Sequence, residues 1–129
     1  MAKPDLQHER LEQKIKQVEE EFGPKLYAML MQFNRERLDG KGQVKEAAIT
    51  DEHSLRWMMK WKEAKVTYEM SIVIRLEDTG REAQVSGVWV HRHASTPLDY
   101  EGHTPTTRMR RVTNLSMKDI HSAIEAEWG

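Results

Sequence analysis

The sequence predicts a single α+β domain with an N-terminal helix, a four-stranded antiparallel meander and a C-terminal helix. Three observations predict this class. Apolar residues recur at helical spacing near both ends, they alternate at every second position across much of residues 54–92, and 129 residues suffice for one domain but not for two ordinary ones. We therefore expect one domain over 1–129, with a helical region at 5–38, an antiparallel sheet at 54–113 and a helix at 116–128.

The N-terminal helix is predicted by an apolar stripe with charged and amide side chains between its members. The stripe begins with Leu11, Ile15, Val18 and Phe22 and resumes with Leu26, Met29, Leu30 and Phe33. Gly23-Pro24 interrupts it, and proline is tolerated in the first turn of a helix but not in its interior. We expect either one helix kinked at Gly23-Pro24 or two helices split there. Residues 43–52 show no clear period and are interpreted as a linker.

The clearest strand covers residues 66–76, where every even position is apolar. A turn at 78–80 leads into a second strand. If Leu76 pairs with Arg81, the register sets together Ile74 and Ala83, Ile72 and Val85, Met70 and Gly87, and Tyr68 and Trp89. This register predicts one buried face.

An upstream strand is predicted because Leu55, Trp57, Met59 and Trp61 also alternate. A helix capped by Thr50 or Asp51 is the competing interpretation. A hairpin around Glu63-Ala64 favours the strand, because it adds four apolar pairs to the buried face: Trp61 and Val66, Met59 and Tyr68, Trp57 and Met70, and Leu55 and Ile72. Glu-Ala suits a two-residue turn poorly, so we expect a wider loop.

The last third of the sequence predicts a loop, a strand and a helix. Residues 94–105 read as the loop and residues 106–113 as a fourth strand. Ser116 with Asp119 matches a capping box, and Leu115 with Ile120 matches a hydrophobic staple, which together predict where the last helix begins. Its buried stripe is expected to consist of Met117, Ile120, Ile124 and Trp128.

Composition excludes several classes of function. No cysteine is present, so disulfides, a thiolate nucleophile and a cysteine zinc site are excluded. No apolar run approaches a membrane span, and the first residues lack the apolar stretch of a signal peptide, so a cytoplasmic protein without membrane contact is expected. Phosphate-binding loops, dinucleotide fingerprints and nucleophile elbows are absent, which favours a protein that is not an enzyme.

A histidine pair is a candidate metal or ligand site. His91 and His93 lie two apart on a predicted strand and therefore on one face. The following loop adds Asp99, Glu101 and His103, and imidazole with carboxylate oxygen is a ligand set for a divalent metal. The alternative is that the two histidines are half-buried side chains at the frayed end of the core, and no cofactor is otherwise predicted.

A basic face is the second candidate site. The predicted register turns several cations away from the core, and cations in rows can follow phosphates. The candidate polyanion-binding residues are Arg56, Lys60, Lys62, Arg92, Arg108, Arg110 and Arg111. The tryptophans are predicted to be core residues, so a base-stacking surface is lacking. The alternative interpretation is an ordinary solvated sheet face.

The aromatic core and the N-terminal helix give two further hypotheses. Trp57, Trp61, Tyr68 and Trp89 are predicted to line one face with Gly87 between them, which leaves either a ligand cavity or a packed core. The apolar seam of the helix suits packing on the sheet and equally suits a homodimer.

The function expected from the sequence is therefore that of a non-catalytic binding or regulatory protein that acts through macromolecular contacts, including self-association. Two alternatives stay open. One is nucleic-acid or polyanion binding by the basic face, and the other is a small-molecule or metal site at His91, His93 and loop 94–105.

Overall fold

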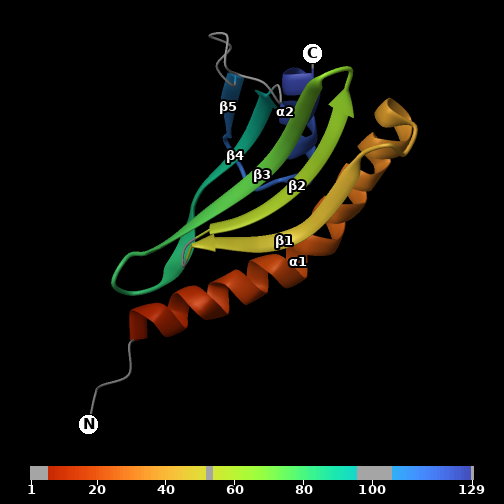
Figure 1. The fold of residues 1–129 in the computed structure, drawn as a ribbon. Helices are drawn as coiled ribbons and strands as arrows, with labels where there is room; N and C mark the ends of the chain where they lie inside the picture. The colour runs from red at the N-terminus through yellow and green to blue at the C-terminus, as the bar shows by residue number, and fades with distance from the viewer. Residues whose placement is uncertain (1–5, 52–53, 96–105, 129) are drawn as a thin grey trace.

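The fold is an antiparallel sheet covered on one face by two helices. The computed structural model describes residues 6–51, 54–95 and 106–128. Its elements in chain order are α1 (Leu6–Leu38), β1 (Gln43–Asp51), β2 (Ser54–Glu63), β3 (Val66–Asp78), β4 (Ala83–Ser95), β5 (Thr106–Val112) and α2 (Met117–Trp128) (Figure 1). The strands lie in the order β1-β2-β3-β4-β5, and each pairs with its neighbours in antiparallel fashion. The α+β class is confirmed.

The sheet has five strands, so the prediction of four is wrong. The additional strand is β1, which occupies the segment interpreted as a linker. Its pairing with β2 shifts register between Lys45 and Ala48 and again between Ile49 and Asp51. These irregularities break the period of two that marks a strand in sequence, and the segment is rich in Lys, Glu and Ala, which are depleted in strands.

Helix α1 is continuous from Leu6 to Leu38 with Pro24 in its interior, so the split alternative is wrong. The ribbon bends between its two halves (Figure 1), as expected where proline removes a backbone hydrogen bond. Its buried residues match the predicted stripe: Leu11, Ile15, Val18, Leu26, Leu30 and Phe33. Neither helix, over the residues described, is both long and apolar enough to cross a membrane.

The turn after α1 is fixed by a buried asparagine. The Asn34 side chain donates a hydrogen bond to the Gly42 carbonyl at 3.0 Å and accepts one from the Gly42 N–H at 2.7 Å. Asp39 and Gly40 have positive φ angles of 51° and 78°, which end the helix. The amide of Asn34 thereby ties α1 to the start of β1.

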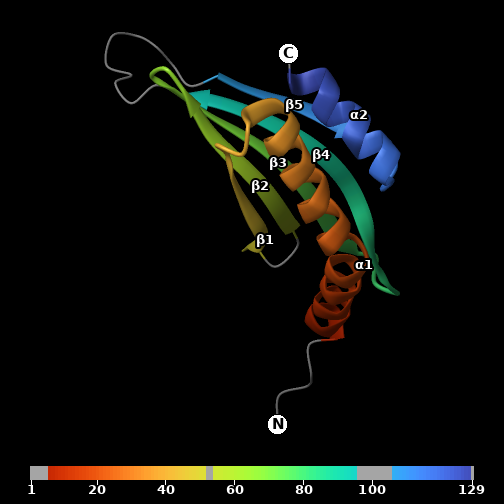
Figure 2. The same cartoon turned by 90° about the vertical axis from the view of Figure 1, so that its right-hand side faces the viewer.

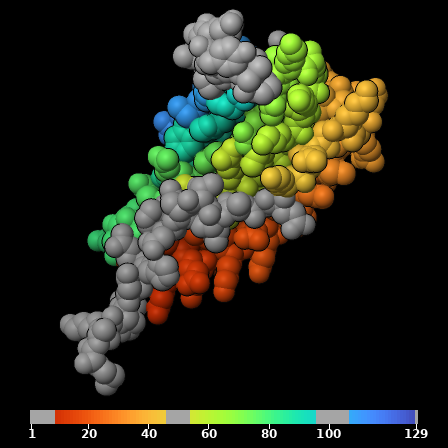
Figure 3. All heavy atoms as spheres, viewed as in Figure 1, coloured from red at the N-terminus to blue at the C-terminus, as the bar shows by residue number. Residues whose placement is uncertain are grey.

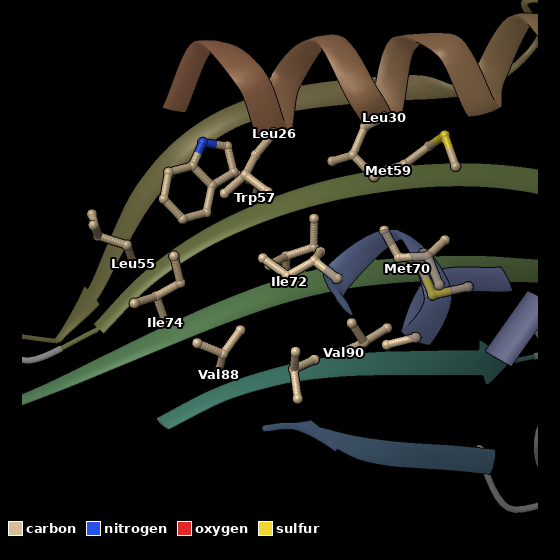
Figure 4. Close-up of a cluster of buried hydrophobic side chains, with 14 of the residues drawn as sticks. Leu26, Leu30, Leu55, Trp57, Met59, Met70, Ile72, Ile74, Val88 and Val90 are labelled. Carbon is tan, nitrogen blue, oxygen red and sulfur yellow. The ribbon is translucent and has the colours of Figure 1, made fainter. Parts of the chain in front are cut away.

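Both helices lie on one face of the sheet, which we call the helix-side face (Figure 2). The opposite face is called the outer face. Figure 4 shows the core between α1 and the strands, with Trp57, Met59, Met70 and Ile72 pointing into it. Helix α2 closes the core at the other side, where Trp128 stacks on Trp61 with the ring centroids 4.9 Å apart.

The register of β2 with β3 differs from the predicted one by two residues. Trp61 pairs with Tyr68 and Trp57 with Ile72, and the connection is a two-residue turn at Ala64 and Lys65. Ala64 adopts a positive φ of 54°, so the expected wider loop is wrong. An even shift keeps every side chain on its predicted face. The helix-side placement of Leu55, Trp57, Met59 and Trp61 is confirmed.

The register of β3 with β4 differs from the predicted one, since Leu76 pairs with Val85 and not with Arg81, and it contains an odd step that was not predicted. Leu76 pairs with Val85, but Arg75 pairs with Gly87, so Ser86 is an extra residue in β4. The Ser86 hydroxyl donates to the Arg75 carbonyl at 3.2 Å. Such a bulge reverses the face of every later side chain in the strand. Val88 and Val90 therefore enter the core, whereas the residues at odd positions after the bulge lie on the outer face: Gly87, Trp89, His91 and His93.

The C-terminal elements follow their predictions closely. Strand β5 ends one residue before the expected boundary, and α2 begins at Met117 directly after Ser116. The Ser116 hydroxyl accepts a hydrogen bond from the Asp119 N–H at 3.3 Å, which caps the helix. Ile120 and Ile124 are fully buried, Met117 and Trp128 are partly buried against the core, and Glu127 is a buried carboxylate that the stripe did not include.

Candidate binding surface on the outer sheet face

The centre of the outer face is the indole of Trp89, which lies across Gly87. A Cβ at Gly87 would stand 2.2 Å from Cη2 of Trp89, so only the missing side chain lets the ring occupy this place. The guanidinium carbon of Arg75 lies 5.5 Å from the ring centroid and that of Arg111 lies 5.9 Å from it. Both distances are within the range of cation–π attraction. Trp89 is half-buried.

Arg56 is the second ordered cation of this surface. Its side chain forms an ion pair with Glu69 and donates a hydrogen bond from Nε to the Ser71 hydroxyl at 3.3 Å. Strands β2 and β3 position these groups, because the partners lie on adjacent strands with their side chains on the same face. The pair neutralises one of the carboxylates that the outer face carries.

The histidine pair lies beside this network. His91 is opposite Ser71 on β3, and His93 is opposite Glu69. Burial lowers the pKa of His91 below its ordinary value, and the charges of Arg56 and Arg75 lower it further. Nδ1 of His93 shares a hydrogen bond of 2.7 Å with the Thr107 hydroxyl. The pair shares a face, as the sequence predicts, but that face is the outer one.

An open depression of about 450 Å³ runs over these strands between Arg75 and His93. It is lined by side chains of β2, β3, β4 and β5, among them Arg56, Ser71 and His91. Figure 3 shows strand atoms, in lime to blue, at the molecular surface on the side drawn in Figure 1. The outer face is therefore a solvated surface on which the indole of Trp89 and the exposed side chain of Met109 lie among polar groups.

The predicted basic residues divide between the two faces. Arg56, Lys60, Lys62 and Arg111 lie on the outer face. Arg92 is opposite Met70 with its guanidinium 5.3 Å from the centroid of the Tyr68 ring, so its predicted outward direction is wrong. Arg108 and Arg110 also lie on the helix-side face, opposite Arg92 and Val90. The bulge at Ser86 is the reason, since it reverses the later part of β4 and the strand paired with it.

The helix-side arginines gather around one carboxylate of α2. Nε of Arg110 is 2.8 Å and Nε of Arg108 is 3.6 Å from an oxygen of Glu127, whose side chain is 8% exposed. Arg92 lies alongside with its Nε buried and, among the residues described, without a hydrogen-bond partner. This cluster fastens α2 to β5 and does not belong to the outer face.

Of the candidate metal or ligand residues, the structure describes His91 and His93. Asp99, Glu101 and His103 lie outside the described residues. Over the described ranges, His, Cys, Asp and Glu form no group of three that could hold a metal. His91 and His93 stay candidate metal or ligand residues as a prediction.

The predicted cavity beside Gly87 in the core is wrong, because Gly87 and Trp89 lie on the outer face. On the helix side, Trp61 stacks on Tyr68 with the ring centroids 5.4 Å apart, and Trp57 is 1% exposed. Trp57, Trp61 and Tyr68 therefore belong to the packed side of the sheet.

Sequence reasoning missed Trp89 as a surface residue, and with it the role of Arg75. One signal was present. From Val85 to Val90, apolar residues occupy both odd and even positions, so the segment supports two registers that place opposite faces in the core. The register that buries Val88 and Val90 is the one adopted.

The fold and this surface define a class: a small α+β protein whose antiparallel sheet is covered by two helices on one face and carries cations around an indole on the other. No protein-family model matches the chain, and neither the curated proteins nor the solved structures that were compared with it gave a match. The particular function is therefore argued from the residues of this chain.

Proposed function

We propose that this is a non-catalytic binding protein that contacts an anionic macromolecule through its outer face. The observation that carries the proposal is the imbalance of charge there. Among the residues whose side chains the structure describes, the outer face carries the cations Lys45, Arg56, Lys60, Lys62, Arg75 and Arg111 against the carboxylates Glu69 and Glu77. Rows of cations attract polyanions by releasing their counterions.

The proposal is supported by the distribution of charge over the whole chain. The formal net charge is only −1, so the positive outer face is balanced by acidic residues elsewhere, such as Glu19-Glu20-Glu21 on α1. A surface of one sign on a nearly neutral protein steers a partner to one face. Among the described residues of that face, the polar groups contact one another in pairs, as Arg56 does with Glu69 and His93 with the Thr107 hydroxyl.

A heparin column developed with a salt gradient tests the proposal. Replacing the exposed lysines Lys45, Lys60 and Lys62 by alanine is expected to lower the eluting salt concentration strongly. The matched control replaces three exposed lysines of the helices, Lys16, Lys25 and Lys118, and is expected to elute close to the wild type. Equal losses in both triple variants, or no retention of the wild type, would overturn the proposal.

Self-association is the alternative partner expected from the sequence. The apolar seam of α1 is buried against the sheet of its own chain, with Leu26 and Leu30 fully covered, so this seam is occupied. A homodimer would need another surface. Light scattering on the eluted protein separates the two cases, since polyanion binding by a monomer requires no second copy.

A further inference from the structure

We infer that the anionic partner of the outer face is a single-stranded nucleic acid, one base of which stacks on Trp89. The inference rests on the proposed function, because it names the class of polyanion. Cations alone would accept any polyanion, whereas an indole among them adds a surface for an unpaired base.

The position of the Trp89 ring is fixed by the backbone beneath it. Its benzo edge occupies the volume that a side chain at position 87 would fill, with Cη2, Cζ3 and Cζ2 all within 2.9 Å of that Cβ position. Strand β4 is paired on both sides at this point, with Val73 of β3 and Arg111 of β5 as the partners of Trp89. A ring held in this way is preorganised, so a base that stacks on it meets little cost of ordering the ring.

The two arginines at the ring supply the groups that a nucleotide needs besides stacking. Arg75 and Arg111 both lie within 6 Å of the ring centroid. Among the described residues neither forms an ion pair, in contrast to Arg56, Arg108 and Arg110. A guanidinium can contact a phosphate or stack on the free face of a base. The arrangement therefore offers an aromatic ring with two guanidinium groups over it, which a base can meet together with the ring.

A single strand fits this arrangement better than a duplex or a sulfated polysaccharide. In a duplex the base faces are covered by their neighbours, and a polysaccharide has no aromatic face to stack. The open depression beside Arg75 is lined by hydroxyl and imidazole groups, including Ser71 and His91, which can hydrogen-bond to sugar or phosphate oxygens.

The test measures fluorescence anisotropy of labelled oligothymidylate and oligouridylate of about 12 nucleotides, a length in the range of single-strand sites on sheet surfaces. A duplex of the same length and heparin serve as competitors. The variants are Trp89→Ala, Trp89→Phe and Arg75→Lys, the last of which keeps the charge and removes the planar group. Circular dichroism and thermal melting check that each variant is folded.

We expect the wild type to prefer the single strands to the duplex. Trp89→Ala should weaken their binding by about 5- to 100-fold, Trp89→Phe should weaken it least, and Arg75→Lys should fall between them. Retention on heparin should stay near the wild-type value in the two Trp89 variants. If Trp89→Ala does not fold, the relative affinities of Trp89→Phe and Arg75→Lys for the single strands decide whether the inference holds.

Two results would overturn the inference and leave the proposed function standing. One is equal affinity of the wild type for single strands and duplex, and the other is oligonucleotide binding that Trp89 and Arg75 variants leave unchanged while heparin still binds. Failure of the wild type to bind heparin and all oligonucleotides would overturn both.

Discussion

The indole of Trp89 occupies the space of the side chain that Gly87 lacks, with Cη2 only 2.2 Å from the Cβ position. This relationship between two residues of one strand sets the shape of the outer face. Residues i and i+2 of a strand point to the same face, and here the larger one covers the smaller. Gly87 is therefore required for packing on the outside of the sheet and not for a helix approaching on the inside.

Gly87→Ala is expected to destabilise the protein by about 1–3 kcal/mol, because the ring of Trp89 must leave its place. In a Trp89→Ala background the same change should cost nothing or stabilise, since the new methyl group then meets open space and the unfolded chain loses freedom. Urea unfolding of the wild type, the two single variants and the double variant measures the coupling free energy between the two positions. Equal penalties in both backgrounds would show that the ring does not constrain position 87.

Glu127→Gln is expected to lower the free energy of unfolding by about 1–3 kcal/mol. The carboxylate is buried and meets Arg110 and Arg108, so the amide leaves these charges without a counter-charge. The matched control on the same helix is Glu125→Gln. The Glu125 carboxylate pairs with Arg37 at 38% exposure, so this change should lower the free energy of unfolding by less than about 1 kcal/mol. Thermal melting of both variants measures the difference, and equal effects would contradict the assignment of Glu127 as the anchor of α2.

Asn34→Ala is expected to cost about 1–3 kcal/mol, because it leaves both the N–H and the carbonyl of Gly42 without their side-chain partner. Gln32→Ala is the control on the exposed side of α1, where the Gln32 side chain donates a hydrogen bond to Glu36, and it should change stability by less than about 0.5 kcal/mol. Chemical unfolding compares the two. A loss in Asn34→Ala no greater than that in the control would mean that the turn holds without the amide.

His91 is expected to make stability depend on pH in a known direction. Its pKa in the folded state is lowered, so below pH 6.5 the unfolded chain binds more protons than the folded one. Its contribution is complete above pH 6.5 and is lost as the pH falls through the lowered pKa. Melting temperatures at neutral and mildly acidic pH should therefore differ less in His91→Gln than in the wild type. The same pH dependence in both proteins would show that His91 does not carry it.

A helix or strand of this fold was predictable where its apolar residues define a single buried face. The stripe of α1 and the even positions of β3 allow a single face each, and the cap at Ser116 marks the start of α2. Strand β1 was not predictable, because two register shifts remove its period. The kinked form of α1 prevailed over two helices, since the apolar stripe continues across Pro24 and its burial on the sheet outweighs one lost hydrogen bond.

The candidate surface was harder to predict than the fold, because it depends on pairing. Arg56, Lys60 and Lys62 were placed correctly, since an even error in the β2–β3 register leaves faces unchanged. Arg92 and Trp89 were each predicted on the wrong face, because β4 contains one extra residue before them. A bulge has no fixed sequence signature. Val88 and Val90 lie on one face of the strand and Trp89 on the other, and either face is apolar enough to be predicted as the buried one.

The extra residue of β4 is Ser86. If Ser86 paired with Arg75 in place of Gly87, every later residue of β4 would move to the opposite face of the sheet. Two imidazoles and an indole would then face the helices, and Val88 and Val90 would be exposed to solvent. Deleting Ser86 has a milder expected outcome, because Val85 stays opposite Leu76 and Gly87 opposite Arg75. The shortened strand would pair without a bulge, and Arg111 of β5 would keep the indole as its neighbour.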